Sequence, residues 1–489
     1  MTRRGLRAWL PRIAVGGVAR SVVLVGAATA VGQGALIIAS PILARLYSPE
    51  AFGLLSVYAA LLTILLAVSS LRFDMAIPIA HDDGEAVHLL LVSILIALCA
   101  SGVLALVLLV WGAQIATALG VSLLTPLLWV LPIALVVASV SQSIASWAVY
   151  QRTFPALGRM RAIQGLTQAI AQAALGLLRL GPGGLIVGDV AGRILGTEQL
   201  LRPLIGTLRT TRLNGSALLR HARTHWGFAR VMTMASFLNT LSLQVPFLLI
   251  PGMFGLDASG QYFLAYRVLV LPASLVGAGV SQVFFGEASH RRDDPQRLHD
   301  MTLNVAVSLL VFSIPTYAIV TLAAPALITL LFGAQWDTAG LYARLLAPGL
   351  ILWSVASPIS TLLLVGRRER ESLAFTLAEL FLKTGALLVG AALGSLVIGV
   401  AALTAASILI NIGALWRIMR VAAASVLDLV RPGLRIMAVT LPSIAVVTLA
   451  LSLRPIGVVV VAGAGWAVSF LLAARFSPEL RALVSGSHD

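Results

Sequence analysis

The chain has 489 residues, of which 59% are hydrophobic and 11% are charged. Soluble domains carry about 25% charged residues because water must wet their surface, so this composition excludes soluble enzymes, disordered proteins and disulfide scaffolds. The formal net charge of +15 at pH 7 comes almost wholly from arginine. Because the arginines lie between apolar stretches rather than in one patch, we expect no nucleic-acid partner.

Apolar stretches of about 20 residues, the length that crosses a hydrocarbon core of roughly 30 Å, recur along the whole chain. The first follows an arginine-rich N-terminus and is too long for a cleaved signal peptide, so we interpret it as a membrane helix. The sequence therefore predicts an all-α polytopic membrane protein of about fourteen transmembrane helices. We expect them near 18–45, 52–80, 87–111, 124–150, 156–178, 184–205, 229–252, 258–286, 302–324, 343–365, 372–392, 395–418, 434–452 and 456–474.

The arginines also predict the orientation of these helices, because basic residues are retained on the cytoplasmic side of connecting segments. With a cytoplasmic N-terminus, most basic residues fall on the inside. Only Arg45, Arg179, Arg344 and Arg454 fall on the outside. We therefore expect both termini to be cytoplasmic.

A short pattern that occurs twice indicates an internal duplication. Residues 48–53 and residues 255–260 share an acidic residue, an alanine and a glycine at the same places, each before an even-numbered helix. Six helices separate the copies, which predicts two six-helix lobes related by a pseudo-twofold axis along the membrane normal. Chance alignment of apolar helices is the alternative. The expected parts are an N-lobe (1–205), a basic cytoplasmic linker (206–228), a C-lobe (229–420) and helices 13 and 14 with a cytoplasmic tail (421–489).

Three stretches in order give the chain a family resemblance. They are Leu-Arg-Phe-Asp-Met-Ala-Ile-Pro at 71–78, Ala-Arg-Leu-Tyr-Ser-Pro-Glu-Ala-Phe-Gly at 44–53, and Leu-Phe-Gly-Ala-Gln-Trp at 331–336. In these the chain resembles Wzx-type flippases of the multidrug/oligosaccharidyl-lipid/polysaccharide (MOP) exporter superfamily. The resemblance implies a bacterial inner-membrane protein that moves an undecaprenyl-diphosphate-linked oligosaccharide to the periplasmic leaflet, for O-antigen or exopolysaccharide. It also implies alternating access to a central cationic cavity.

The same resemblance sets the expected partners. They are the lipid-linked oligosaccharide, membrane lipids and other membrane proteins of polysaccharide assembly, with the flippase itself a monomer. The sequence contains no Walker A loop, metal-ligand motif or dinucleotide-binding turn. We therefore expect no catalytic residue, metal or cofactor, and a proton or sodium gradient as the energy source.

Arginines within the predicted helices are candidate ligands of the diphosphate. A charge inside the bilayer costs about 2.5–3.5 kcal/mol on insertion scales and therefore faces a bundle interior or a watery cavity. Arginine offers a planar fork that binds two phosphate oxygens and keeps its proton. Snorkelling to the interface or a topological role is the alternative for those near helix ends. The candidates are Arg20, Arg45, Arg72, Arg193 and Arg267.

Carboxylates within the helices are candidates for ion coupling. Asp189 precedes Arg193 by four residues and Glu379 precedes Lys383 by four, a spacing that places partners on one helix face. Self-neutralised structural pairs are the alternative in both cases. Glu198 precedes Arg202 at the same spacing. Asp74 lies two residues from Arg72, which within a helix would point the side chains apart, so Asp74 is expected to need another partner or a proton.

Amide and tyrosine side chains are candidates for contact with sugars. Gln164, Gln168 and Gln172 recur every fourth residue and form one helix face. Unbonded amides are costly in hydrocarbon, so this stripe faces either other helices or the cavity. Tyr262 and Tyr266, one turn apart, either stack on sugar rings or pack in the core.

Two other functions remain open from the sequence. A membrane-embedded polysaccharide polymerase, ligase or glycosyltransferase would normally display a sizeable periplasmic loop with catalytic side chains, which the predicted topology lacks. A cation or drug exporter of the same superfamily would need an acidic cavity, whereas arginines match or outnumber acids within the predicted helices.

Overall fold

The computed structural model describes residues 17–210, 214–290, 294–366, 368–452 and 454–476, and all regular structure in these ranges is helical. The predicted all-α fold is confirmed. Eleven helices among the described residues are long and apolar enough to cross a membrane. The chain is therefore a multi-pass membrane protein, and the predicted count of fourteen spans stays a prediction.

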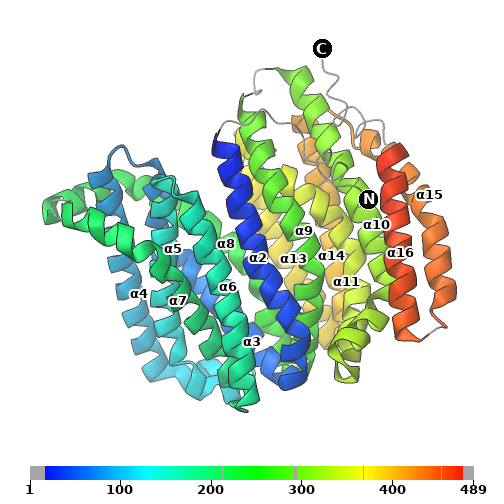
Figure 1. Ribbon diagram of the computed structural model, residues 1–489, viewed down its shortest axis with the longest axis horizontal. Helices are drawn as coiled ribbons and strands as arrows, with labels where there is room; N and C mark the ends of the chain where they lie inside the picture. The colour runs from blue at the N-terminus through cyan, green and yellow to red at the C-terminus, as the bar shows by residue number, and fades with distance from the viewer. Residues whose placement is uncertain (1–16, 211–213, 291–293, 367, 453, 477–489) are drawn as a thin grey trace. The chain divides into compact units, whose positions relative to one another are not determined.

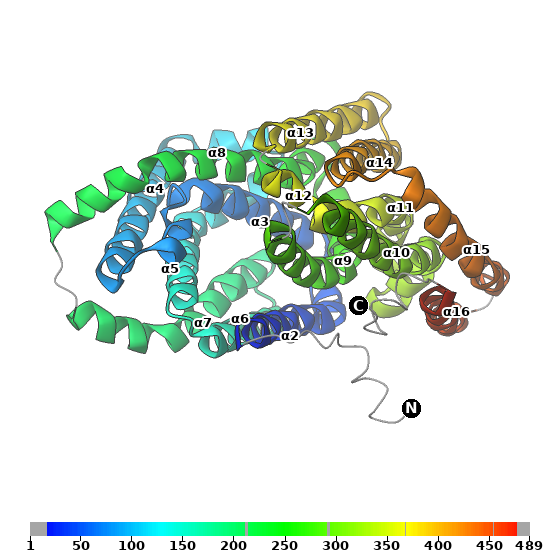
Figure 2. The same ribbon diagram turned by 90° about the horizontal axis from the view of Figure 1, so that it is seen from above.

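The N-terminal unit, Val18–Phe263, is one of two compact units. Its core contains Phe73, Trp147 and Met160, which are almost fully buried. Two of its helices, α6 and α7, pack against each other and are neighbours when seen from above (Figure 2). Its helices are α2 (Gly17–Leu46), α3 (Pro49–Ser69), α4 (Asp83–Ala118), α5 (Val130–Tyr150), α6 (Phe154–Leu177), α7 (Pro182–Thr210), α8 (Gly215–Phe254) and the start of α9 (Leu256–His290).

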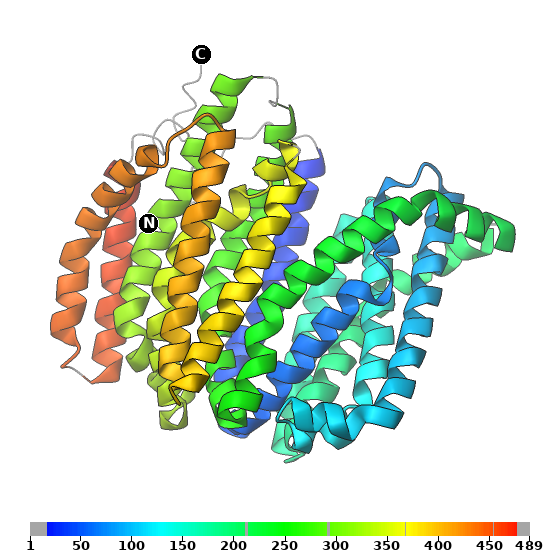
Figure 3. The same cartoon turned by 180° about the vertical axis from the view of Figure 1, so that it is seen from behind.

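The C-terminal unit comprises the described residues from Leu264 onward. Helices that follow one another in the chain pack together, as α10 does with α11 and α13 with α14. Helices α15 and α16 both pack on α10 (Figures 1 and 3). The helices are the rest of α9, α10 (Pro295–Phe332), α11 (Asp337–Ile359), α12 (Leu362–Val365), α13 (Glu369–Ala392), α14 (Leu396–Val421), α15 (Leu427–Ala450) and α16 (Pro455–Phe476). The predicted lobe and linker boundaries stay a prediction.

The end of the second predicted span differs from the expectation. Instead of continuing to residue 80, α3 ends at Ser69, and the chain turns through two short 3₁₀ helices, Phe73–Met75 and Ile77–Ile79. Leu71 and Arg72 adopt left-handed backbone conformations, with φ of 46° and 56°. Such values end an α-helix, because β-carbons disfavour them in a regular run.

The two copies of the duplicated pattern contact each other within the N-terminal unit. A β-carbon on Gly53 would overlap the carbonyl oxygen of Leu256, and one on Gly260 would overlap that of Pro49. Gly53 and Pro49 correspond to Gly260 and Leu256 in the repeat, so the contact is reciprocal. Only glycine permits this backbone approach between α3 and α9. The reciprocal contact supports the interpretation of the pattern as a true duplication.

Candidate functional site

The glutamine stripe of α6 faces α7. Each glutamine lies against a glycine of α7 that is so close that a β-carbon there would overlap the glutamine. Small residues at every fourth position let two membrane helices approach in this way. The α7 glycines were not singled out from the sequence, although their regular spacing is a signal that could have found them. The pairs are Gln164 with Gly196, Gln168 with Gly192 and Gln172 with Gly188.

Two of the glutamines are hydrogen-bonded to other helices. Gln172 is fully buried and donates from Nε2 to the carbonyl oxygen of Leu185 at 2.8 Å. Gln164 donates from Nε2 to the hydroxyl of Ser141 on α5 at 2.8 Å. Gln168 is half-buried. In this conformation Gln172 serves helix contacts, whereas Gln164 and Gln168 keep some exposed surface.

A partly buried ion pair lies beside this stripe. Arg193 donates from Nε to Asp189 Oδ2 at 3.0 Å and from Nη2 to Oδ1 at 3.3 Å, while the Tyr58 hydroxyl donates to Oδ2 at 3.3 Å. Asp189 is 7% exposed. Arg161 of α6 lies within electrostatic range of Arg193. Asp189 is paired with Arg193, and the exposed Arg161 adds a second guanidinium nearby, which leaves this place net cationic. Arg161 is the residue that sequence reasoning missed.

Asp74 has a partner on another helix, as the sequence predicted, and it also contacts Arg72, which the sequence analysis placed apart from it. Gln142 of α5 donates to Asp74 Oδ2 at 3.0 Å and the Ser70 hydroxyl donates to Oδ1 at 2.6 Å. Arg72 Nη1 lies 3.7 Å from Asp74 Oδ2, so the expectation that these two point apart was wrong. The reason is that α3 has already ended, and helical spacing does not apply. Arg72 Nε is buried without a hydrogen-bond partner among the described residues.

A histidine cluster connects the start of α4 with the start of α8. Glu85 Oε1 lies 2.8 Å from His225 Nε2 and 3.6 Å from His221 Nδ1. The His88 ring lies 5.5 Å from that of His221, and His88 is only 5% exposed. Because the Glu85 carboxylate is already paired with these two histidines, it is not available to neutralise the arginines of α8.

In the C-terminal unit, Lys383 Nζ lies 2.7 Å from Glu379 Oε1 on α13, which confirms that this pair forms. Tyr266 of α9 lies within electrostatic range of Glu379, and Tyr266 and Arg267 are both half-buried. Tyr262, by contrast, is 3% exposed and packs on Phe247 in the N-terminal unit, with ring centroids 5.5 Å apart. The two tyrosines predicted to act together therefore differ in surroundings.

The remaining candidates lie apart from these groups. Arg45 is exposed in the last turn of α2, and Glu198 is exposed on α7. Arg20 belongs to α2, but its side chain and that of Arg202 lie outside the described part of the structure. The described residues include no group of three or more histidines, cysteines or acids placed to hold a metal ion.

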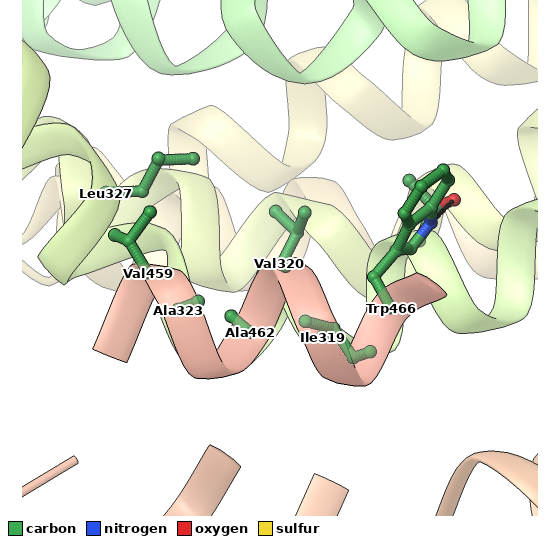
Figure 4. Close-up of a pocket in the computed structure, with 9 residues that line it drawn as sticks. Ile319, Val320, Ala323, Leu327, Val459, Ala462 and Trp466 are labelled. Carbon is green, nitrogen blue, oxygen red and sulfur yellow. Dashed lines mark hydrogen bonds between the residues drawn. The ribbon is translucent and has the colours of Figure 1, made fainter. Parts of the chain in front are cut away.

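An apolar pocket of about 270 Å³ lies between α10 and α16. Ile319 and Val320 of α10 and Val459 and Trp466 of α16 are among the residues that line it (Figure 4). Trp466 donates from Nε1 to the Thr316 hydroxyl at 3.0 Å, which satisfies the only polar atom of the indole. The pocket is suited to a hydrocarbon chain rather than a polar ligand.

Comparison with known proteins adds a family and relatives. Residues 42–340 match the family model described as polysaccharide biosynthesis protein. The succinoglycan biosynthesis transport protein ExoT of Rhizobium meliloti is 27% identical over 399 residues, 78% of this chain and 76% of that protein. The lipopolysaccharide biosynthesis protein WzxC of Escherichia coli is 25% identical over 163 residues, but this match covers only 33% of either chain.

The solved structures show the fold. The lipid II flippase MurJ, in an inward closed conformation, aligns with a TM-score of 0.64 at 14% identity, covering 93% of this chain and 99% of MurJ. An inward-facing multidrug resistance MATE family transporter of the MOP superfamily aligns with a TM-score of 0.64 at 17% identity, covering 80% and 95%. The fold is that of MOP superfamily transporters, as the sequence resemblance implied.

Proposed function

Because the chain belongs to the polysaccharide biosynthesis protein family, we propose that it is a flippase of that pathway. It moves an undecaprenyl-diphosphate-linked oligosaccharide from the cytoplasmic to the periplasmic leaflet of a bacterial inner membrane by alternating access. The observation that carries this proposal is the match to a succinoglycan biosynthesis transport protein over most of both chains.

The cationic groups of the membrane helices suit the headgroup. A diphosphate crossing the bilayer needs compensating positive charge in a site of low polarity. Asp189 pairs with Arg193 but not with the nearby Arg161, so one positive charge stays available there. Arg267 adds a half-buried guanidinium deep in α9. We assign diphosphate binding to Arg161 and Arg193 of the N-terminal unit, with Gln164 and Gln168 available to the sugars, and separately to Arg267 of the C-terminal unit.

The lipid and the driving ion have separate candidates. The pocket between α10 and α16 is lined almost wholly by apolar side chains and suits the isoprenoid chain. The Glu379–Lys383 pair retains 19% and 14% of its side-chain exposure, so water or an ion can reach the carboxylate. Separation of such a pair changes the free energy of its ionised form, which is how a gradient couples to a conformational change.

Transfer between leaflets tests the proposal directly. The protein is reconstituted in liposomes with a fluorescent undecaprenyl-diphosphate oligosaccharide, and the label accessible from outside is measured with and without a proton or sodium gradient. We expect transfer by the wild type and its loss in Arg267→Ala. Arg344→Ala is the matched control, because Arg344 is an exposed arginine of the same unit.

Two outcomes contradict the proposal. Hydrolysis or polymerisation of the lipid without transfer would place the protein among the membrane enzymes of polysaccharide assembly. Efflux of cationic dyes without lipid transfer would make it an exporter of the MATE type. In either case the arginines would be structural.

A further inference from the structure

A second pocket, of about 250 Å³, lies where the end of α3 meets α8 in the N-terminal unit. Val68 and Leu71 line it from the α3 side, and Trp226, Met234 and Phe237 line it from α8. Its wall is apolar except for Arg230 and Thr233. None of these residues belongs to the groups assigned above to the transported lipid.

Arg230 gives this pocket a charge. Its side chain is exposed, and among the described residues it has no ion pair and no hydrogen bond. The two acids beside this region are already satisfied: Asp74 by Ser70 and Gln142, and Glu85 by its histidines. An arginine at the mouth of an apolar pocket, without a carboxylate to neutralise it, is suited to an anion that is attached to a hydrocarbon chain.

The surrounding helix extends this positive field. All forty residues of α8, Gly215–Phe254, lack aspartate and glutamate. Arg220 and Arg223 are exposed on its first turns, ahead of Arg230. Trp226, between Arg223 and Arg230, is 49% exposed, and tryptophan is enriched at the level of lipid headgroups. The basic, aromatic start of α8 is thus placed at a membrane interface, where arginines attract anionic lipid.

We propose that this pocket binds an anionic glycerophospholipid, with its acyl chain between α3 and α8 and its phosphate on Arg230. The lipid is a bound component of the N-terminal unit and not the transported cargo. It fills the space beside the turn at Leu71 and Arg72, where α3 ends in left-handed backbone. Binding there would favour the arrangement of α3 and α8 that forms the pocket.

Photolabelling tests this inference. The full chain is reconstituted in phosphatidylcholine vesicles that contain a minor fraction of phosphatidylglycerol with a diazirine in its acyl chain, and the labelled peptides are mapped. We expect label on α8 around Met234 and Phe237. Arg230→Gln should lower it about fivefold, the effect of one interfacial arginine. Arg223→Gln, which lies outside the pocket, should change it less than twofold.

A second variant separates the pocket from the charge. Thr233→Trp fills the pocket and keeps every arginine, so it should remove the label while the helix content of the protein, measured by circular dichroism, stays unchanged. Equal labelling by a phosphatidylcholine probe, or an equal loss in Arg223→Gln, would overturn the proposal in favour of general electrostatics. Displacement of the label by undecaprenyl phosphate but not by excess phosphatidylglycerol would assign the pocket to the transported lipid class. Neither result depends on leaflet transfer.

Discussion

Each compact unit contains an ion pair between side chains four residues apart on one helix, and the two pairs differ in what else they contact. In the N-terminal unit, polar and charged groups connect different helices: Tyr58 of α3 reaches Asp189 of α7, and Gln142 of α5 reaches Asp74. In the C-terminal unit, Glu379 and Lys383 pair along α13 alone, and the contacts between helices are made by other side chains, such as Trp466 with Thr316. Asp189 is therefore part of the packing of α7 against α3, whereas the pair on α13 has no hydrogen bond to another helix among the described residues and can change with less effect on packing.

This difference determines how a variant is interpreted. Loss of activity after a change at Asp189 reports on folding as well as on transport, because the residue connects α7 with Tyr58 of α3. Loss of activity after a change at Glu379 reports mainly on transport. Stability and transport, measured on the same variants, test this separation.

The largest effect is expected from Asp189→Ala. The change leaves Arg193 without its carboxylate partner in a largely buried site, and breaking a buried pair in this way costs about 3 kcal/mol. The free energy of unfolding in detergent should fall by that amount. Arg193 is 34% exposed at its side chain, which keeps the expected cost at the lower end of the range for buried pairs.

A double variant checks the cause. Asp189→Leu with Arg193→Met removes both charges and should recover most of the stability, since an apolar replacement of a buried pair is often neutral. If Asp189→Ala is as stable as the wild type, the pair contributes nothing to packing. The contrast between the two units would then fail.

The next effect is expected at the reciprocal glycine contact. Gly260→Ala forces α9 away from the backbone of Pro49 and should destabilise the protein by about 1–3 kcal/mol, the usual cost of overpacking. Gly279 lies on the same helix, in the C-terminal unit, with open space around it. Gly279→Ala should therefore be neutral or stabilising by up to about 1 kcal/mol. Equal thermal shifts for the two variants would contradict the close approach.

Hydropathy predicted the helices, and spacing predicted that the three glutamines lie on one face of α6, because helices and helix faces both follow from local periodicity. The two alternatives for Gln172 could not be separated from the sequence, since the choice depends on α7 packing against α6. The end of α3 was predicted wrongly, yet a signal existed. Pro78 disfavours a helix, and Asp82 with Glu85 forms a helix-start pattern in which the Asp82 side chain accepts from the Glu85 N–H at 2.8 Å.

Partners far apart in the chain lie beyond sequence reasoning. Gln142 and Asp74 are 68 residues apart, and nothing in the local pattern connects them. Arg161 was missed for a similar reason. It lies one turn before the glutamine stripe and resembles an arginine near a helix end that only fixes the orientation of the helix in the membrane. Only the packing of α6 on α7 places it near Arg193.

A smaller change in stability is expected from Glu379→Gln. The pair lies on one helix and both side chains keep some exposure, so its loss should cost less than about 1 kcal/mol. If Glu379 couples transport to an ion gradient, transfer driven by the gradient should fall strongly while the protein stays folded. Glu369→Gln, at the exposed start of the same helix, is the matched control. Unchanged gradient dependence in Glu379→Gln would make the pair structural.

The smallest change is expected from Gln172→Met, which separates the two interpretations of the glutamine stripe. Methionine keeps the length of the side chain and loses one hydrogen bond to the Leu185 carbonyl, and such bonds in membrane proteins contribute about 0.6 kcal/mol on average. Gln172 Oε1 is buried without a partner among the described residues, so its removal relieves an unsatisfied atom. Unfolding measurements should show little change, and so should transfer, if Gln172 serves only helix contacts. The same substitution at Gln168, which is half-buried, should reduce transfer more. The reverse order would mean that α6 and α7 separate during transport and expose Gln172 to the sugars.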